Sequence, residues 1–356
     1  MNMERLAALR QQLQTEEREA ILISNPINVR YLSGFTGTAG TLLITEKEAA
    51  LLTDFRYLEQ AAQQAPAYEI VDIAGDTWKQ VANILTDTGC KMLAVEADHL
   101  TVDIYEKIND ALDGITVQPI ISPVAQLRAV KSTAEIAAIE AAQKITDEAF
   151  TQILPFIKPG IREREIALEL EFIMRKKGAS GLSFTMIVGS GSRSALPHGV
   201  ASDKVVAEGD AIVLDFGCIV NGYCSDMTRT VFVGKASDKQ RRIYNLVLQA
   251  QQAALAGLRA GMNGREGDAL ARDVLVAAGL GEYFGHGLGH GVGLEIHEAP
   301  RLSISSENTL QPKMIVTVEP GVYLPGEFGV RIEDMVVIEE DGIRNLTAST
   351  KELICL

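Results

Sequence analysis

The chain has 356 residues, with 33 Lys and Arg against 47 Asp and Glu, which gives a formal net charge of −14. This charge disfavours general binding to nucleic-acid phosphates or anionic membranes. Hydrophobic residues make up 47% and charged residues 22%, which argues against wholesale disorder. No apolar run approaches the roughly 18–20 residues that cross a bilayer. The start of the chain lacks the apolar core of a secretory signal, and the four cysteines form no Cys-x-x-Cys pair. We therefore expect a cytoplasmic protein with reduced thiols.

The first 125 or so residues alternate short apolar runs with helical patterns, which predicts a small α/β domain. The predicted strands are Ala20–Ser24, Thr41–Ile44, Ala49–Thr53, Met92–Val95 and Ile115–Ile120. The predicted helices are Phe55–Gln64, Thr77–Thr86 and Thr101–Leu112. The segment Asn28–Gly40 is rich in small residues, and we expect it to be a loop.

The pattern changes between residues 122 and 131, so we predict two domains, 1–125 and 126–356. Ser132 and Glu135 fit a capping box at the start of a long helix. The helices predicted beyond the boundary are 132–154, 163–177, 239–258 and 265–278. Long helices beside glycine-rich, antiparallel strands predict the α+β class for the second domain and for the chain as a whole.

A hairpin is predicted where two apolar runs flank Asn221-Gly222, because both residues tolerate the positive φ of a type I′ turn. If these two form the turn, Asp215 lies opposite Thr228. Asp226 then lies diagonally from Asp215 on the same face of the hairpin. Diagonal neighbours are ~7–8 Å apart, so the two carboxylates can converge on one cation. A carboxylate that interrupts an interior apolar strand needs such a partner.

A second pair of acids interrupts two later apolar runs, Met314–Pro320 and Gly329–Ile338. Glu319 lies in the first run and Glu333 in the second. The intervening stretch could return the chain antiparallel, and alternation then places Arg331 on the same face as Glu333. Each glutamate alone is weak evidence for a site.

Three of the five histidines fall in the segment HGLGHGVGLEIHE, as His286, His290 and His297. Its many glycines allow close approach of backbone. Four carboxylates and one imidazole are more ligands than one divalent ion needs, and two ions bridged by shared carboxylates fit better. Oxygen-rich ligands favour manganese, iron or cobalt, and zinc is also possible. Paired ions of this kind typically generate hydroxide for a displacement reaction.

These residues resemble the metallopeptidase family with the pita-bread fold, which includes methionine aminopeptidase, Xaa-Pro aminopeptidase and prolidase. The histidine segment matches the proline-peptidase signature at every restrictive position, and the segments SDMTRT, EPGVY and GVRIED match as well. Upstream, NVRYLSGFTGTAG and LTDFRY resemble the creatinase-type N-terminal domain of the proline peptidases. The resemblance covers nearly the whole chain and implies five metal ligands. They are Asp215, Asp226, His290, Glu319 and Glu333.

The resemblance also implies roles for individual residues. Asp215 and Glu333 are expected to bridge two divalent ions, with manganese favoured. Glu319 is also expected to shuttle a proton. Four further residues are implied to act on substrate or to support the ligands. His198 is expected to contact substrate near the scissile bond, His297 to stabilise the tetrahedral intermediate, Arg331 to lie beside the ligands, and His286 to line the site.

The substrates implied by the resemblance are short peptides with proline second. An Xaa-Pro bond offers no N–H to a protease that binds substrates as β-strands. Arg301, four residues after His297, could pair with the free carboxylate of a dipeptide, which favours an Xaa-Pro dipeptidase over an aminopeptidase acting on longer peptides. A non-catalytic pita-bread binding module is a third reading, but retention of all five ligands argues against it. The family also suggests a homodimer.

Overall fold

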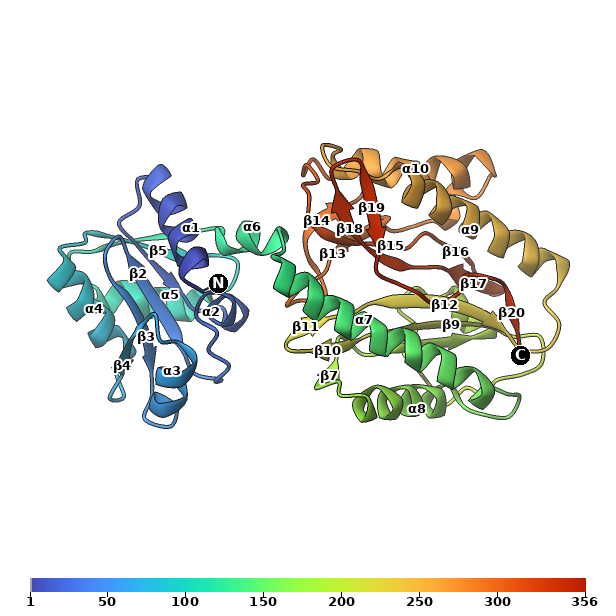
Figure 1. Ribbon diagram of the computed structural model, residues 1–356, viewed down its shortest axis with the longest axis horizontal. Helices are drawn as coiled ribbons and strands as arrows, with labels where there is room; N and C mark the ends of the chain where they lie inside the picture. The colour runs from blue at the N-terminus through green and yellow to red at the C-terminus, as the bar shows by residue number, and fades with distance from the viewer. Residues whose placement is uncertain (1) are drawn as a thin grey trace. The chain divides into compact units, whose positions relative to one another are not determined.

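The computed structural model describes residues 2–356, and the chain separates into two compact units, one ending at Arg128 and the other beginning at Ala129 (Figure 1). The junction lies in the short helix α6 (Val124–Ala129). No helix within residues 2–356 combines the length and apolarity needed to span a bilayer.

The first unit is built on a six-stranded sheet in the order β4-β3-β2-β1-β5-β6 (Figure 1). The antiparallel β1, β2 and β3 are flanked by parallel pairs, β3 with β4 and β1 with β5. The strands are β1 (Ala20–Ile23), β2 (Thr41–Thr45), β3 (Ala49–Thr53), β4 (Glu69–Asp72), β5 (Met92–Glu96) and β6 (Thr116–Ile120). The helices are α1 (Asn2–Thr15), α2 (Pro26–Ser33), α3 (Leu58–Gln64), α4 (Thr77–Thr88) and α5 (Val102–Ala111). The predicted α/β character is confirmed.

The loop predicted over Asn28–Gly40 is wrong in its first half, because α2 begins at Pro26. The Asn25 side chain caps this helix by accepting from the backbone N–H of Ile27, and Gly34 ends it at a φ of 83°. Proline is well suited to the first turn of a helix, where its missing N–H costs nothing. The small residues that suggested a loop occupy only the second half of the segment.

The second unit packs four long helices against two principal sheets that are antiparallel except for the parallel pair β12 and β20 (Figure 1). The helices are α7 (Thr133–Ile153), α8 (Glu163–Lys176), α9 (Asp238–Gly257) and α10 (Gly264–Ala277), with short 3₁₀ turns η1 (Leu154–Phe156), η2 (Gly191–Ala195) and η3 (Gly281–Tyr283). The predicted capping box of Ser132 and Glu135 opens α7. Helices beside antiparallel sheets confirm the α+β class.

One principal sheet has the order β20-β12-β9-β8 and the other β14-β13-β15-β18-β19, with smaller sheets β11-β10-β7 and β16-β17. The strands of the β20-β12-β9-β8 sheet and of the β11-β10-β7 sheet are β7 (Gly181–Leu182), β8 (Ile187–Ser190), β9 (Ala211–Phe216), β10 (Cys218–Val220), β11 (Tyr223–Cys224), β12 (Met227–Phe232) and β20 (Ile354–Cys355). The others are β13 (Gly289–Gly291), β14 (Glu298–Leu302), β15 (Ile315–Val318), β16 (Gly321–Leu324), β17 (Phe328–Arg331), β18 (Asp334–Glu339) and β19 (Gly342–Asn345).

The Asn-Gly hairpin has the predicted register. Asn221 and Gly222 have φ values of 51° and 86°, as a type I′ turn requires. Val220 pairs with Tyr223, and Asp215 pairs with Thr228. The two aspartates therefore lie on one face of this hairpin.

A second antiparallel pairing carries the two glutamates and is interrupted at them. Val318 pairs with Asp334 on one side of the break, and Gly321 pairs with Arg331 on the other. Within the break, the backbone N–H of Glu319 donates to Leu288 and that of Glu333 donates to Thr228. The break redirects both strands and brings Glu333 to the hairpin that carries the aspartates.

Candidate active site

A cavity of about 720 Å³ in the second unit is lined by all ten residues predicted for the site. They are His198, Asp215, Asp226, His286, His290, His297, Arg301, Glu319, Arg331 and Glu333. They come from β9, β13, β14 and β17, from the loops beside these strands, and from the break between the glutamate strands. Side chains far apart in the sequence thus converge because the two principal sheets approach each other here.

Three of the carboxylates are buried with an oxygen that has no hydrogen-bond partner among the described residues. These atoms are Oδ1 of Asp215, Oδ1 of Asp226 and Oε1 of Glu333. A buried carboxylate oxygen without a partner is costly. Ligand atoms of Asp226, His290 and Glu333 also lie within 4.8 Å of one another. The donor set therefore fits divalent cations, which would supply the missing positive charge.

Burial shifts the pKa values of this cluster so that the neutral forms of its side chains are favoured. Burial and then the charges of Glu333 and Asp215 raise the pKa of Asp226 well above its usual range. Burial and the Glu319 charge do the same to Glu333. The pKa of Glu319 rises to about 7, mainly through burial, although Arg331 opposes the rise. Without a cation, these acids would therefore resist full ionisation.

His290 presents one ring nitrogen to the carboxylates. Its Nδ1–H donates to the carbonyl of Gly291 at 3.1 Å, so Nε2 carries the lone pair. That Nε2 lies 3.3 Å from Glu319 Oε1 and 3.6 Å from Asp226 Oδ2. Burial and the neighbouring His297 lower the pKa of His290 to about 3. A neutral imidazole lone pair that faces carboxylate oxygens is the arrangement expected around a cation.

The glycines beside His290 permit this placement. A Cβ at Gly289 would overlap the carbonyl oxygen of Thr317, and one at Gly291 would overlap that of Ala299. Strand β13 therefore fits between its neighbours only without side chains at these positions. The Thr317 hydroxyl supports both ligands, since it accepts from the backbone N–H of His290 and donates to Glu319 Oε1, each at 3.0 Å.

Arg331 and Thr228 hold two of the other carboxylates, those of Asp215 and Glu333. Arg331 Nη2 donates to Asp215 Oδ2 at 2.6 Å, and its Nε donates to the Thr228 hydroxyl at 3.0 Å. That hydroxyl in turn donates to Glu333 Oε2 at 2.7 Å. Outer contacts of this kind orient ligands and tune their basicity. Asp215 and Glu333 thus each have one oxygen fixed by a hydrogen bond and one oxygen without a partner among the described residues.

Tyr323 belongs to this network and was missed as an individual residue by sequence reasoning. Its hydroxyl accepts from Arg331 Nη1 at 2.7 Å and donates to His286 Nε2 at 2.9 Å, while His286 Nδ1–H donates to the carbonyl of Gly287. Burial and the Arg331 charge lower the pKa of His286 to about 4. Its position in the EPGVY segment was the available signal, but nothing in the sequence showed that its hydroxyl reaches Arg331.

The remaining predicted residues lie at the exposed rim of the cavity. The ring of His297 meets that of His290 edge to face, with centroids 4.2 Å apart. Arg301 is paired with His290 across strands β13 and β14, and His198 lies just beyond η2. All three are exposed, so they can reach a ligand that enters the cavity.

Comparison with known proteins agrees with this geometry. Residues 137–340 match the model of metallopeptidase family M24, and residues 5–130 match that of the creatinase/prolidase N-terminal domain. The solved Xaa-Pro dipeptidase from Bacillus anthracis is 49% identical, covers 100% of both chains and superposes with a TM-score of 0.98.

Two further proteins are similar over nearly the full length. The Xaa-Pro dipeptidase of Pyrococcus furiosus is 38% identical and covers 99% of each chain. The solved X-Pro aminopeptidase from Thermotoga maritima is 40% identical, covers 99% of each chain and has a TM-score of 0.91. The chain therefore belongs to metallopeptidase family M24, carries a creatinase/prolidase N-terminal domain, and is an enzyme of a family that implies divalent metal ions.

Proposed function

We propose that the protein is an Xaa-Pro dipeptidase, which hydrolyses the bond before proline in dipeptides. The observation that carries this proposal is the cavity in which unpaired, buried carboxylate oxygens and the His290 lone pair meet beside an exposed arginine. Relatives named Xaa-Pro dipeptidase, at 38% and 49% identity, support the substrate class.

Two divalent ions, with manganese favoured, would be held by the five predicted ligands. Asp215 and Glu333 would bridge the ions, Asp226 would hold one, and His290 with Glu319 the other. When bound, such ions act as Lewis acids on a carbonyl and make water acidic enough to ionise near neutral pH. The free oxygens of Asp215, Asp226 and Glu333 support this assignment.

Glu319 is the proposed proton carrier. Its Oε1 is engaged by Thr317, which leaves Oε2 to accept a proton from attacking water and return it to the leaving nitrogen. The prolyl nitrogen needs that proton because it departs as an amine. General acid–base assistance of this kind typically contributes ~10²–10⁴-fold to rate. His297 would donate to the developing oxyanion, and His198 would contact the substrate near the scissile bond.

The substrate is recognised by its ends and its ring rather than by strand pairing, because the Xaa-Pro amide has no N–H. The carboxylates of the cavity favour a cationic amino terminus. Arg301 is proposed to bind the carboxylate of a dipeptide, since it is exposed and lines the same cavity as His297.

An Xaa-Pro aminopeptidase is the second candidate, and it is supported by the similar solved structure of that name from Thermotoga maritima. A longer peptide presents a neutral amide after proline, so Arg301 would then have no charged partner. The two candidates therefore differ in what Arg301 contacts.

The deciding experiment measures cleavage of Ala-Pro and Ala-Pro-Ala by the manganese-loaded protein and by the Arg301→Ala variant. For a dipeptidase, the change should lower kcat/KM for Ala-Pro about tenfold to a hundredfold, since a charge-assisted contact is worth ~1.5–3 kcal/mol. Residual cleavage of Ala-Pro-Ala should hardly change. Arg175→Ala, which removes an exposed arginine of α8, is the control. Faster cleavage of Ala-Pro-Ala by the wild type, unaffected at Arg301, would establish the aminopeptidase instead.

We also propose a homodimer in the cytoplasm, with the two domains meeting near residue 125. Resemblance to the proline peptidases supports the dimer, and sedimentation of the purified protein tests it.

A further inference from the structure

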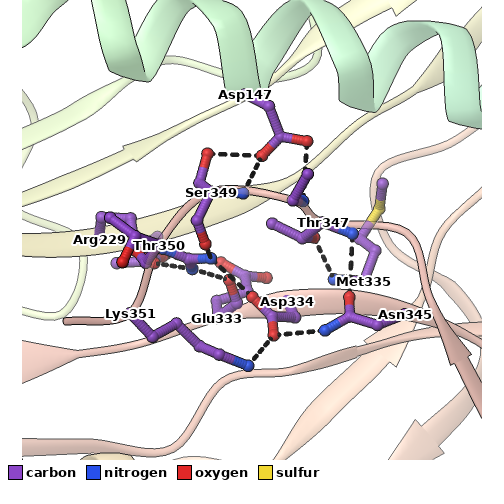
Figure 2. Close-up of polar contacts among 12 residues, drawn as sticks. Asp147, Arg229, Glu333, Asp334, Met335, Asn345, Thr347, Ser349, Thr350 and Lys351 are labelled. Carbon is purple, nitrogen blue, oxygen red and sulfur yellow. Dashed lines mark hydrogen bonds and ion pairs between the residues drawn. The ribbon is translucent and has the colours of Figure 1, made fainter.

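Two charged residues lie directly behind the candidate metal site. Arg229 follows Thr228 on β12, and Asp334 follows Glu333 at the start of β18. Successive residues of a strand point to opposite faces. Glu333 lines the cavity and accepts from the Thr228 hydroxyl. Arg229 and Asp334 instead form an ion pair at 2.8 Å, and neither lines the cavity (Figure 2).

The Arg229 side chain is 1% exposed. The five N–H donors of its guanidinium bind groups of β12, of the Glu333–Asp334 segment and of residues 349–350. Nη1 donates to the backbone carbonyls of Thr228 and Glu333, and Nη2 donates to Asp334 and to the carbonyl of Ser349. Nε donates to the carbonyl of Thr350 at 3.0 Å (Figure 2). A planar fork with five fixed donors can hold such a set, and a lysine cannot.

Asp334 is fully buried and is satisfied on both oxygens. Oδ1 accepts from Arg229, while Oδ2 accepts from Asn345 Nδ2 at 2.7 Å and from Lys351 Nζ at 2.5 Å (Figure 2). The carboxylate thus ties β18 to β12 and to the end of the chain. No other group is needed to complete its bonding.

The segment Ser349–Lys351 is itself anchored. Asp147, on α7, accepts from the backbone N–H groups of Ala348 and Ser349 at 3.0 and 2.8 Å (Figure 2). Tyr244, on α9, donates to the carbonyl of Lys351 at 3.1 Å. Two helices therefore hold the segment against Arg229.

The location matters because β12 and β18 belong to different sheets. Asp215 and Asp226 come from the β9–β12 hairpin. His290 lies on β13 of the other sheet, Glu319 directly follows β15 and Glu333 directly precedes β18. The distance between the two groups of ligands thus depends on contacts between the sheets. Arg229 makes such contacts at Glu333 itself, since it binds that residue's carbonyl.

We propose that Arg229 and Asp334, covered by Ser349–Lys351, form an intersheet clamp that positions Glu333 and thereby sets the spacing of the metal ligands. Both are positioning residues, because neither faces the cavity. The clamp rests on the proposed metal site but not on the proposed peptide substrate.

The test measures manganese binding calorimetrically to chelator-stripped, refilled protein, together with the thermal unfolding midpoint. Arg229→Lys keeps the charge but loses the fork, and should weaken manganese binding about 10–100-fold, the range found when groups that orient metal ligands are removed. Asp334→Asn should have the same effect, because it places an N–H₂ against the donors of Asn345 and Lys351.

Leu275→Ala is the matched control, since Leu275 is a fully buried residue of α10 within the core. It should lower the unfolding midpoint but leave manganese affinity within twofold of the wild type. If Arg229→Lys binds manganese as tightly as Leu275→Ala does, the clamp is refuted while the metal site stands. If the wild type itself binds no manganese, the proposed site is refuted.

A measurement on the wild type covers the case in which both clamp variants fail to fold. Coupling between two sites is reciprocal, so manganese should slow backbone hydrogen exchange in residues 348–352 severalfold. An unchanged exchange rate there, in protein shown to bind manganese, would overturn the proposal.

Discussion

Glu333 and Asp334 are adjacent, buried acids with opposite electrostatic situations. Burial and the Glu319 charge raise the pKa of Glu333 well above its usual range, and its Oε1 has no partner among the described residues. Burial also acts on Asp334, but the charges of Arg229 and Lys351 outweigh it and hold the pKa of Asp334 below its usual value. The cost of burying the acid is compensated at Asp334 and is not compensated at Glu333.

The same contrast separates the two faces of the strands. The back of the site is a closed network in which every charge has a partner, and it needs nothing more to be stable. The face that lines the cavity has more buried carboxylate oxygens than donors to pair with them. Natural proteins tolerate such an imbalance mainly where function requires it, so the uncompensated face is the one to interpret as a site.

Metal removal should have the largest effect of the changes that test the difference between the two faces. Chelation should abolish peptidase activity, because the carboxylates lose the cations that would balance them, and manganese or cobalt should restore it. Activity is measured as proline release from Ala-Pro before and after dialysis, with metal content checked by elemental analysis. Full activity in metal-free protein would show that the residues of the cavity catalyse the reaction without a metal ion.

The proton-carrying role of Glu319 is tested by Glu319→Gln. The amide keeps an oxygen for a metal but cannot carry a proton, so kcat should fall by roughly 10²–10⁴-fold while metal content falls less. If rate and metal content decline in parallel, Glu319 acts only as a ligand.

His290→Ala removes the one imidazole among the predicted ligands. The substitution should lower the occupancy of one metal position and leave the fold intact, because the ring lies at the cavity wall. Elemental analysis and circular dichroism measure the two effects. Two ions retained per chain with normal turnover would remove His290 from the ligand set.

The adjacent acids can be compared directly in the metal-free protein. Asp334→Asn leaves Arg229 without its buried partner and should lower the free energy of unfolding by about 3–5 kcal/mol, as breaking a buried ion pair does. Glu333→Gln removes a buried acid that has no positive partner and should leave that free energy unchanged or higher. Urea unfolding of both variants decides, and equal losses would erase the distinction between the two faces.

The smallest expected effect is on the pH dependence of stability. Because the folded-state pKa of Glu319 is raised to about 7, the unfolded chain loses that proton first as the pH rises, so the folded state loses stability from the ordinary carboxyl range up to about pH 7. The pKa values of Asp226 and Glu333 are also raised, so these two acids add to the loss. His290, lowered to about 3, acts oppositely, but only below its ordinary value of 6.5.

Above pH 6.5 the carboxylates therefore decide alone, and the unfolding midpoint of the metal-free protein should fall as the pH rises from 6.5 through the pKa of Glu319, about 7. Manganese should remove the decline, because bound cations keep the acids ionised at no cost. A flat midpoint in metal-free protein would contradict the raised pKa values.

Local signals determined much of the fold and the candidate site. The Asn221-Gly222 turn fixed the register that pairs Asp215 with Thr228, because a two-residue turn leaves the flanking strands one pairing. The capping box at Ser132 marked the start of α7 for a similar reason, since its bonds join residues three apart. The glycine-rich histidine segment could be recognised because its chemistry is concentrated within thirteen residues.

Only the tertiary structure decided which partners lie across sheets. Tyr323, Thr317 and the Arg229–Asp334 pair join residues that are distant in sequence or act through a side-chain direction that no local pattern fixes. The helix α2 was missed because the small residues that follow it suggested a loop for the whole segment, whereas Val29, Tyr31 and Leu32 of the helix are buried. The sequence alone therefore specified which residues carry chemistry, while non-local packing specified which of the buried charges are compensated and which are left for a cation.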